Sequence, residues 1–157
     1  MSYQAVELSA SAEISQHNIK TEISTVRYLS AHAELFYKTG TKNVRDHQLK
    51  EVFGVLKNLH GDVKNLLKGP PFNSSPTVPD MEIKHRPVAL ISESPPSSLI
   101  NTLIECEKFQ KNQQLQIIQS LCGFRLGLAL SAQTAKLQIA IDQLKNIATT
   151  QTAYMRQ

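Results

Sequence analysis

The stretch Asn43-Val44-Arg45-Asp46-His47-Gln48-Leu49 opens the segment that decides the fold. Asp46 suits the N-cap of a helix, because its carboxylate can accept a hydrogen bond from a free backbone N–H of the first turn. After it, one helical face collects the residues Leu49, Phe53, Leu56, His60, Val63 and Leu67. Lys68-Gly69-Pro70 ends the pattern, since glycine permits a left-handed turn and proline cannot continue a helix. The sequence therefore predicts an amphipathic helix over residues 46–68.

A second helical pattern precedes this one. Its stripe consists of Ile19, Ile23, Val26, Ala33 and Tyr37. Thr39-Gly40 ends the run, so we expect a helix over residues 13–39, with residues 1–12 as a loose arm. The segment 41–45 is too short for anything but a reversal of the chain. The two helices should therefore form an antiparallel hairpin.

All seven prolines lie in the segment that follows, between Gly69 and Pro96. Prolines at this density exclude a helix. Neither flank is large enough to bury a core alone, so a linker between two domains is disfavoured. We interpret residues 69–97 as a crossover that runs along the helices.

Two more helices are predicted, over residues 98–121 and 126–150. Ser94 or Ser97 can cap the first of them, and a break near Cys122-Gly123-Phe124 or at Gly127 separates the two. The fold class is therefore an all-α four-helix bundle, a single domain over residues 1–157. Because the first and third connections are short and the second is long, the second and third helices should run parallel. This is the connectivity of ferritin-like folds.

Several short motifs resemble those of a group of small, largely uncharacterised bacterial proteins with a ferritin-like fold. These are Glu34-Leu35-Phe36-Tyr37, Val44-Arg45-Asp46 with Leu49-Lys50 and Phe53, and Ile104-Glu105-Cys106-Glu107. The resemblance covers about two thirds of the chain and omits the N-terminal arm and the proline-rich segment. It implies a fold whose di-iron members bind metal through two glutamates and two Glu-x-x-His pairs. One such pair occurs here, Glu82 with His85, and it lies in the predicted crossover, so the resemblance supports the fold more than metal chemistry.

Polar side chains interrupt the predicted core. One interpretation is a site for iron or another divalent metal built on Glu34, His60 and Glu107, with Glu22 as a further ligand. The other is a hydrogen-bonded polar layer that fixes the register of the helices, to which three amides on the third and fourth helices would add: Gln110, Gln114 and Gln133. We favour the polar layer, because a single histidine in an apolar stripe is more often a paired core residue than a ligand. No bound cofactor is then expected.

Two surface features have alternative interpretations. His32 points away from its stripe, as in histidine phosphotransfer domains, but the following Ala33-Glu34-Leu35-Phe36 lacks the lysine and glycine of those domains. The carboxylate of Glu34 would also repel a phosphoryl group. Lys50, Lys57 and Lys64 recur every seven residues, which we interpret as a solvated flank rather than a phosphate-binding surface.

The composition and the absence of certain motifs argue against several classes of function. The net charge of +4 and the pI near 9.1 are not enough to indicate a nucleic-acid-binding protein. The chain has no apolar run long enough to span a membrane. Its first residues lack the order of a secretion signal, in which charged residues precede an apolar stretch, so we expect a cytoplasmic protein. Neither a nucleophile motif nor a glycine-rich phosphate loop occurs.

We therefore expect a non-catalytic bundle that acts through protein contacts, with an unidentified protein partner. Self-association as a homodimer or another homo-oligomer is also expected, because four residues widen the stripes of the first two helices beyond a single seam. These residues are Leu29, Phe36, Leu59 and Leu66. The competing hypotheses are a metal-binding or metal-oxidising bundle and a histidine phosphotransfer module.

Overall fold

Four helices make up the described part of the chain. The structure, a computed structural model, describes residues 2–68, 86, 96–121 and 123–155. In chain order the helices are α1 (Ser2–Asn43), α2 (His47–Leu66), α3 (Ser97–Ser120) and α4 (Arg125–Met155). The prediction of an all-helical chain with four helices is confirmed for these residues. The predicted crossover over residues 69–97 lies outside them, apart from Arg86 and the residues that begin α3.

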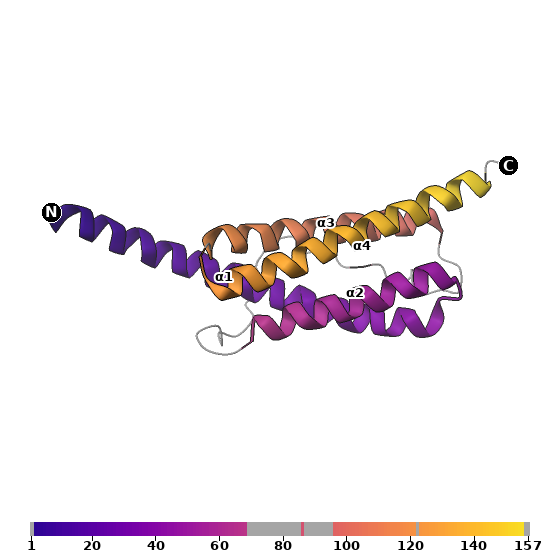
Figure 1. Cartoon of the computed structure of the whole chain (residues 1–157), viewed down its shortest axis with the longest axis horizontal. Coiled ribbons are helices and arrows are strands. Elements are labelled where there is room, and N and C mark those ends of the chain that lie inside the picture. Colours follow the sequence, from indigo (N-terminus) through magenta and orange to yellow (C-terminus); the bar gives the residue numbers. More distant parts are fainter. Residues whose placement is uncertain (1, 69–85, 87–95, 122, 156–157) are drawn as a thin grey trace.

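The helices pack side by side, each mainly against two neighbours (Figure 1). Helix α1 contacts α2 and α3, and α4 contacts the same two helices. The colours of Figure 1 show that α2 and α3 run in one direction and that α1 and α4 run in the other. Each of these main contacts therefore joins two antiparallel helices.

The start of α2 agrees with its sequence signals. The Oδ1 atom of Asp46 accepts a hydrogen bond from the backbone N–H of Leu49 at 2.9 Å, as expected of an N-cap. In the short turn before it, the backbone N–H of Val44 donates to the carbonyl oxygen of Gly40 at 2.9 Å, and the Val44 side chain is buried. The turn is thus bonded to the end of α1 and also packs into the core.

Helix α1 begins at Ser2, so the predicted loose arm over residues 1–12 is wrong. The segment 2–18 contains no glycine or proline and has alanines at positions 5, 10 and 12, which favour a helix. Figure 1 shows that these first turns extend past the ends of the neighbouring helices. Residues 1–12 carry no apolar stripe, so hydrophobic periodicity gives no signal for this part of the helix.

The predicted end of this helix at Gly40 is also wrong, because α1 continues to Asn43. A Cβ atom at Gly40 would lie 2.7 Å from the Cδ2 atom of Phe53, closer than carbon atoms can approach. Glycine therefore lets α1 and α2 come together around the Phe53 ring. Its role here is close packing and not the termination of a helix.

The last two helices differ from prediction at their ends. The N-cap of α3 is Pro96, whose side chain has no hydrogen-bond acceptor. Ser97 is already the first helical residue, so the prediction that Ser97 is the cap is wrong. Ser94 lies outside the described residues. Gly123 has a φ of +90°, which only glycine adopts without strain, and it turns the chain towards α4 as predicted. Gly127, the other predicted place for the break, lies inside α4, which runs to Met155 and not to residue 150, since residues 151–155 contain no glycine or proline.

The residues expected to drive self-association lie mostly within the bundle. Leu29 and Leu59 are only 5% and 3% exposed, Phe36 packs against the core, and Leu66 is half-buried. These side chains therefore do not form an apolar outer face. The exposed large hydrophobic residues are Leu35, Val55, Leu115, Phe124, Leu128 and Ile139. None of the described helices has the length and apolar character needed to span a membrane.

Replacing Gly40 with alanine tests the close approach of α1 and α2. The added methyl group would overlap the buried Phe53 ring, so we expect a loss of about 1–3 kcal/mol in the free energy of unfolding. Gly54→Ala is the control, because a Cβ atom there meets nothing within 4 Å. In that variant the higher helix propensity of alanine should add about 0.5–1 kcal/mol. Urea unfolding followed by circular dichroism measures both changes, and equal stabilisation of the two variants would contradict the contact.

Candidate functional site

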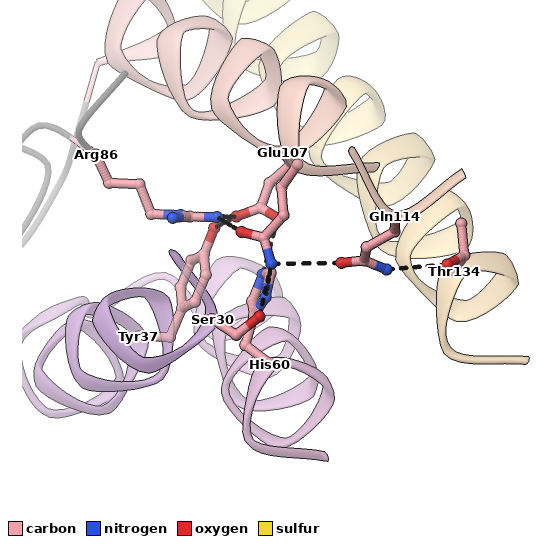
Figure 2. A network of polar contacts seen from close by, with 8 residues as sticks. Ser30, Tyr37, His60, Arg86, Glu107, Gln114 and Thr134 are labelled. Carbon is pink, nitrogen blue, oxygen red and sulfur yellow. Dashed lines mark hydrogen bonds and ion pairs between the residues drawn. The ribbon is translucent and has the colours of Figure 1, made fainter. Parts of the chain in front are cut away.

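A chain of polar side chains crosses the interior of the bundle (Figure 2). It draws on all four helices and on one residue from the segment between α2 and α3. We call it the interior polar network, and its members are Ser30, Tyr37, His60, Arg86, Glu107, Gln110, Gln114 and Thr134. Its three α3 residues are spaced by three and four positions, which places them on one helical face.

Glu107 is the centre of this network and is fully buried. Its Oε1 atom accepts hydrogen bonds from the Tyr37 hydroxyl and from Nε and Nη2 of Arg86, the last two at 2.8 and 2.6 Å. Its Oε2 atom accepts one from Nε2 of His60 at 2.9 Å. A buried carboxylate is costly unless it is paired and hydrogen-bonded. Both oxygens of Glu107 meet that requirement.

Arg86 supplies the positive charge. Its side chain is 6% exposed, although the residue belongs to the segment between two helices. Besides Glu107, its Nη2 atom donates to Oε1 of Gln110 at 3.1 Å. The guanidinium carbon lies 5.6 Å from the centre of the Tyr37 ring, within range of a cation–π interaction. Arg86 therefore binds α1 and α3 at the same time.

His60 is held through both ring nitrogens. A carboxylate can only accept, so the hydrogen bond to Glu107 requires that Nε2 of His60 carries the hydrogen. Nδ1 then accepts from the amide of Gln110 at 3.0 Å. The imidazole also stacks on the Tyr37 ring, with 5.8 Å between centroids and 7° between planes. These contacts fix both the tautomer and the orientation of the ring.

Gln110 extends the network towards α4. Its Nε2 atom has two hydrogens and lies near three acceptors, on His60, on Ser30 at 2.9 Å and on Gln114 at 3.3 Å. The longest of these contacts is the weakest. The amide of Gln114 donates to the Thr134 hydroxyl at 2.9 Å, and that hydroxyl donates to a backbone carbonyl of α4. One connected set of hydrogen bonds thus reaches every helix.

The paired charges determine the ionisation of the network. Burial alone would raise the pKa of Glu107, but the positive charge of Arg86 and the hydrogen bonds from His60 and Tyr37 outweigh burial and hold that pKa well below its usual range. Burial would lower the pKa of Arg86, whereas the carboxylate of Glu107 raises it above its usual value. Burial and the same carboxylate raise the pKa of Tyr37. The network therefore contains a carboxylate, a guanidinium and a neutral phenol.

Of the four residues predicted as metal ligands, the structure brings two together, His60 and Glu107. Glu34 is half-exposed, and its Oε2 atom pairs with Nζ of Lys64 at 2.5 Å. Glu22 is half-buried, burial raises its pKa, and it does not belong to the network. Among the described residues, no group of three or more His, Cys, Asp or Glu side chains is arranged to hold a metal ion.

The other predicted features are scattered. The Glu82 and His85 pair lies outside the described residues. His32 is exposed as predicted, and its ring lies 4.3 Å from the ring of Tyr28. The prediction that Gln133 belongs to the polar layer is wrong, because its side chain is not part of the network. Its Oε1 atom is buried and receives no hydrogen bond from a described residue.

Sequence reasoning missed the roles of Tyr37 and Arg86. Tyr37 occupies an apolar stripe, where an aromatic residue is expected simply to fill the core. Arg86 lies in a segment without helical periodicity, so no pattern places it. The available signal was indirect: Glu107 in a buried stripe requires a cation, and Arg86 is the one arginine among residues 69–97.

Comparisons with family models, with curated proteins and with solved structures each give no match to this chain. The fold and the interior polar network are therefore the basis on which a function can be proposed. Both are defined by contacts within a single chain.

Replacing Arg86 with methionine tests the buried ion pair. Glu107 would keep its burial and lose its cation, so we expect a loss of about 3–5 kcal/mol in the free energy of unfolding. Lys64→Met is the matched control, because the pair of Lys64 with Glu34 is partly exposed and should be worth less than about 1 kcal/mol. Chemical unfolding measures both variants. Equal losses would contradict the central place of Arg86.

The acid dependence of stability tests the ionised state of Glu107. Because its pKa is lowered in the folded chain, its contribution is complete above the unfolded-state value near 4.5 and declines as the pH falls below it. As the pH falls, the free energy of unfolding of the wild type should therefore approach that of Glu107→Gln. The difference between the two should shrink by up to about 1.4 kcal/mol per pH unit. Urea unfolding between neutral pH and pH 3 measures the difference, and a difference that does not change with pH would refute the assignment.

Proposed function

We propose that this protein is a non-catalytic helical bundle that acts through protein–protein contacts, including contacts between its own copies. The observation that carries the proposal is the internal pairing of the interior polar network. The carboxylate of Glu107 accepts four hydrogen bonds from neighbouring side chains, and Arg86 neutralises its charge. Groups bonded in this way stabilise an arrangement of helices and offer no free atom to a substrate.

Exposed apolar side chains support the same proposal. Leu128 and Phe124 are 72% and 63% exposed and lie one helical turn apart at the start of α4. Large apolar residues exposed together commonly mark a surface that a partner covers. We infer that the beginning of α4 is one such contact surface.

We also propose that the bundle has ferritin-like connectivity and is related to the small bacterial proteins that its motifs resemble. The parallel direction of α2 and α3 and the antiparallel direction of all main neighbours support this. The proposal requires that residues 69–95 cross from one end of the bundle to the other.

A metal-binding bundle is the competing function, and the observation that favours it is the contact between His60 and Glu107. A divalent cation at this place would have to displace Arg86, whose two nitrogens lie 2.8 and 2.6 Å from Glu107. One iron, manganese or zinc ion per chain after loading, lost in both His60→Ala and Glu107→Gln, would favour this alternative.

Site-specific photo-crosslinking tests the proposed function directly. A photoreactive phenylalanine at Leu128, introduced in cells that produce the protein at its native level, should give discrete crosslinked protein products. The same group at Gln116, an exposed polar position on α3, is the control and should give few. If both positions gave the same products, or neither gave any, the proposed contact surface would be wrong.

A further inference from the structure

A groove lies between α2 and α4 on the surface of the bundle. It has a volume of about 300 Å³, and both helices contribute to its walls. Leu59 and Ala140 line its apolar floor and are buried. Val55 and Ile139 stand at its edges and are 47% and 59% exposed. The groove therefore exposes apolar surface on both helices.

Opposite charges lie on the two walls of this groove. Asp62 comes from α2 and Lys136 from α4, both are exposed, and no ion pair joins either to another described residue. Because α2 and α4 run antiparallel, Asp62 and Lys136 lie towards the same end of the groove, whereas Val55 lies towards the other end and Ile139 near the middle. The end of the groove that holds these charges thus has a negative group on one wall and a positive group on the other.

We propose that two copies of this chain associate through the groove, about a two-fold axis that runs along it. Such an axis places α2 of each copy opposite α4 of the other. Asp62 of each copy then faces Lys136 of the second copy, and the apolar side chains of Val55 and Ile139 lie on helices that face each other. The surface is complementary to itself, with two intermolecular ion pairs at one end and apolar contacts along the rest.

The size of the surface agrees with this partner. Helix α2 has 20 residues and is therefore about 30 Å long, and two adjacent helices are about 20 Å wide. The face offers about 600 Å² per copy, at the low end for a specific interface. We therefore expect a dimer that dissociates in the micromolar range. This inference rests on the proposed function and deepens it by naming the partner and the surface.

Charge reversal tests the proposed axis. Sedimentation velocity on the full chain between about 1 and 200 µM should show a reversible dimer for the wild type. Asp62→Lys and Lys136→Asp should each raise the dissociation constant at least about tenfold, because like charges then face each other twice. The double variant restores both pairs with their signs exchanged, so its dissociation constant should return to within about threefold of the wild type.

Two further variants separate the groove from the rest of the surface. Ile139→Glu should weaken the dimer at least about tenfold, because it places a charge in the apolar part of the interface. Leu35→Glu is its control, since Leu35 is exposed on α1 away from the groove, and it should leave the dissociation constant within about twofold. Circular dichroism of each variant verifies that the helices are retained.

A wild-type chain that remains monomeric at 200 µM would overturn the inference. So would a dimer that persists unchanged in both single charge reversals, or a double variant that fails to recover. The proposed function has a separate readout, the crosslinking at Leu128, which lies outside the groove. Loss of the dimer with retained crosslinking would refute the groove alone, and the opposite result would refute the proposed contact surface at the start of α4.

Discussion

The ion pair between Glu107 and Arg86 is the interaction on which the arrangement of this bundle depends. A carboxylate with no solvent exposure must obtain its hydrogen bonds from the protein, and it does so from α1, from α2 and from the segment before α3. Apolar stripes supply most of the stabilisation, but they tolerate small shifts of one helix along another. Directional bonds to one buried group do not, so we infer that the network selects the register.

Much of the helical architecture follows from the spacing of apolar residues, because burial of one face is a local property of the sequence. The cap at Asp46 and the core positions of His60 and Glu107 were predictable because they too depend on residues close by in the chain. Arg86 was not, since its place depends on a contact across the bundle and not on its neighbours in the chain. Gly40 was misinterpreted because a glycine that ends a helix and one that admits a neighbouring ring look alike in sequence.

The interior and the surface of the bundle have different roles in this account. Inside, every charged member of the network is bonded to another, which favours a fixed scaffold. Outside, the groove between α2 and α4 and the start of α4 expose apolar side chains beside unpaired charges or polar residues. A rigid interior keeps such surfaces in a constant shape, and preorganised surfaces bind with a smaller loss of conformational entropy.

The most direct measurement is the ionisation of Glu107 itself, observed by NMR of the δ-carboxyl carbon in protein labelled with ¹³C-glutamate. The signal absent from Glu107→Gln identifies the residue. Glu107 should remain a carboxylate from pH 8 down to about pH 3, because the guanidinium of Arg86 and the hydrogen bonds stabilise the charged form. A signal that titrates at or above the ordinary pKa of 4.5 would show an unpaired or protonated carboxyl group and would refute the buried ion pair.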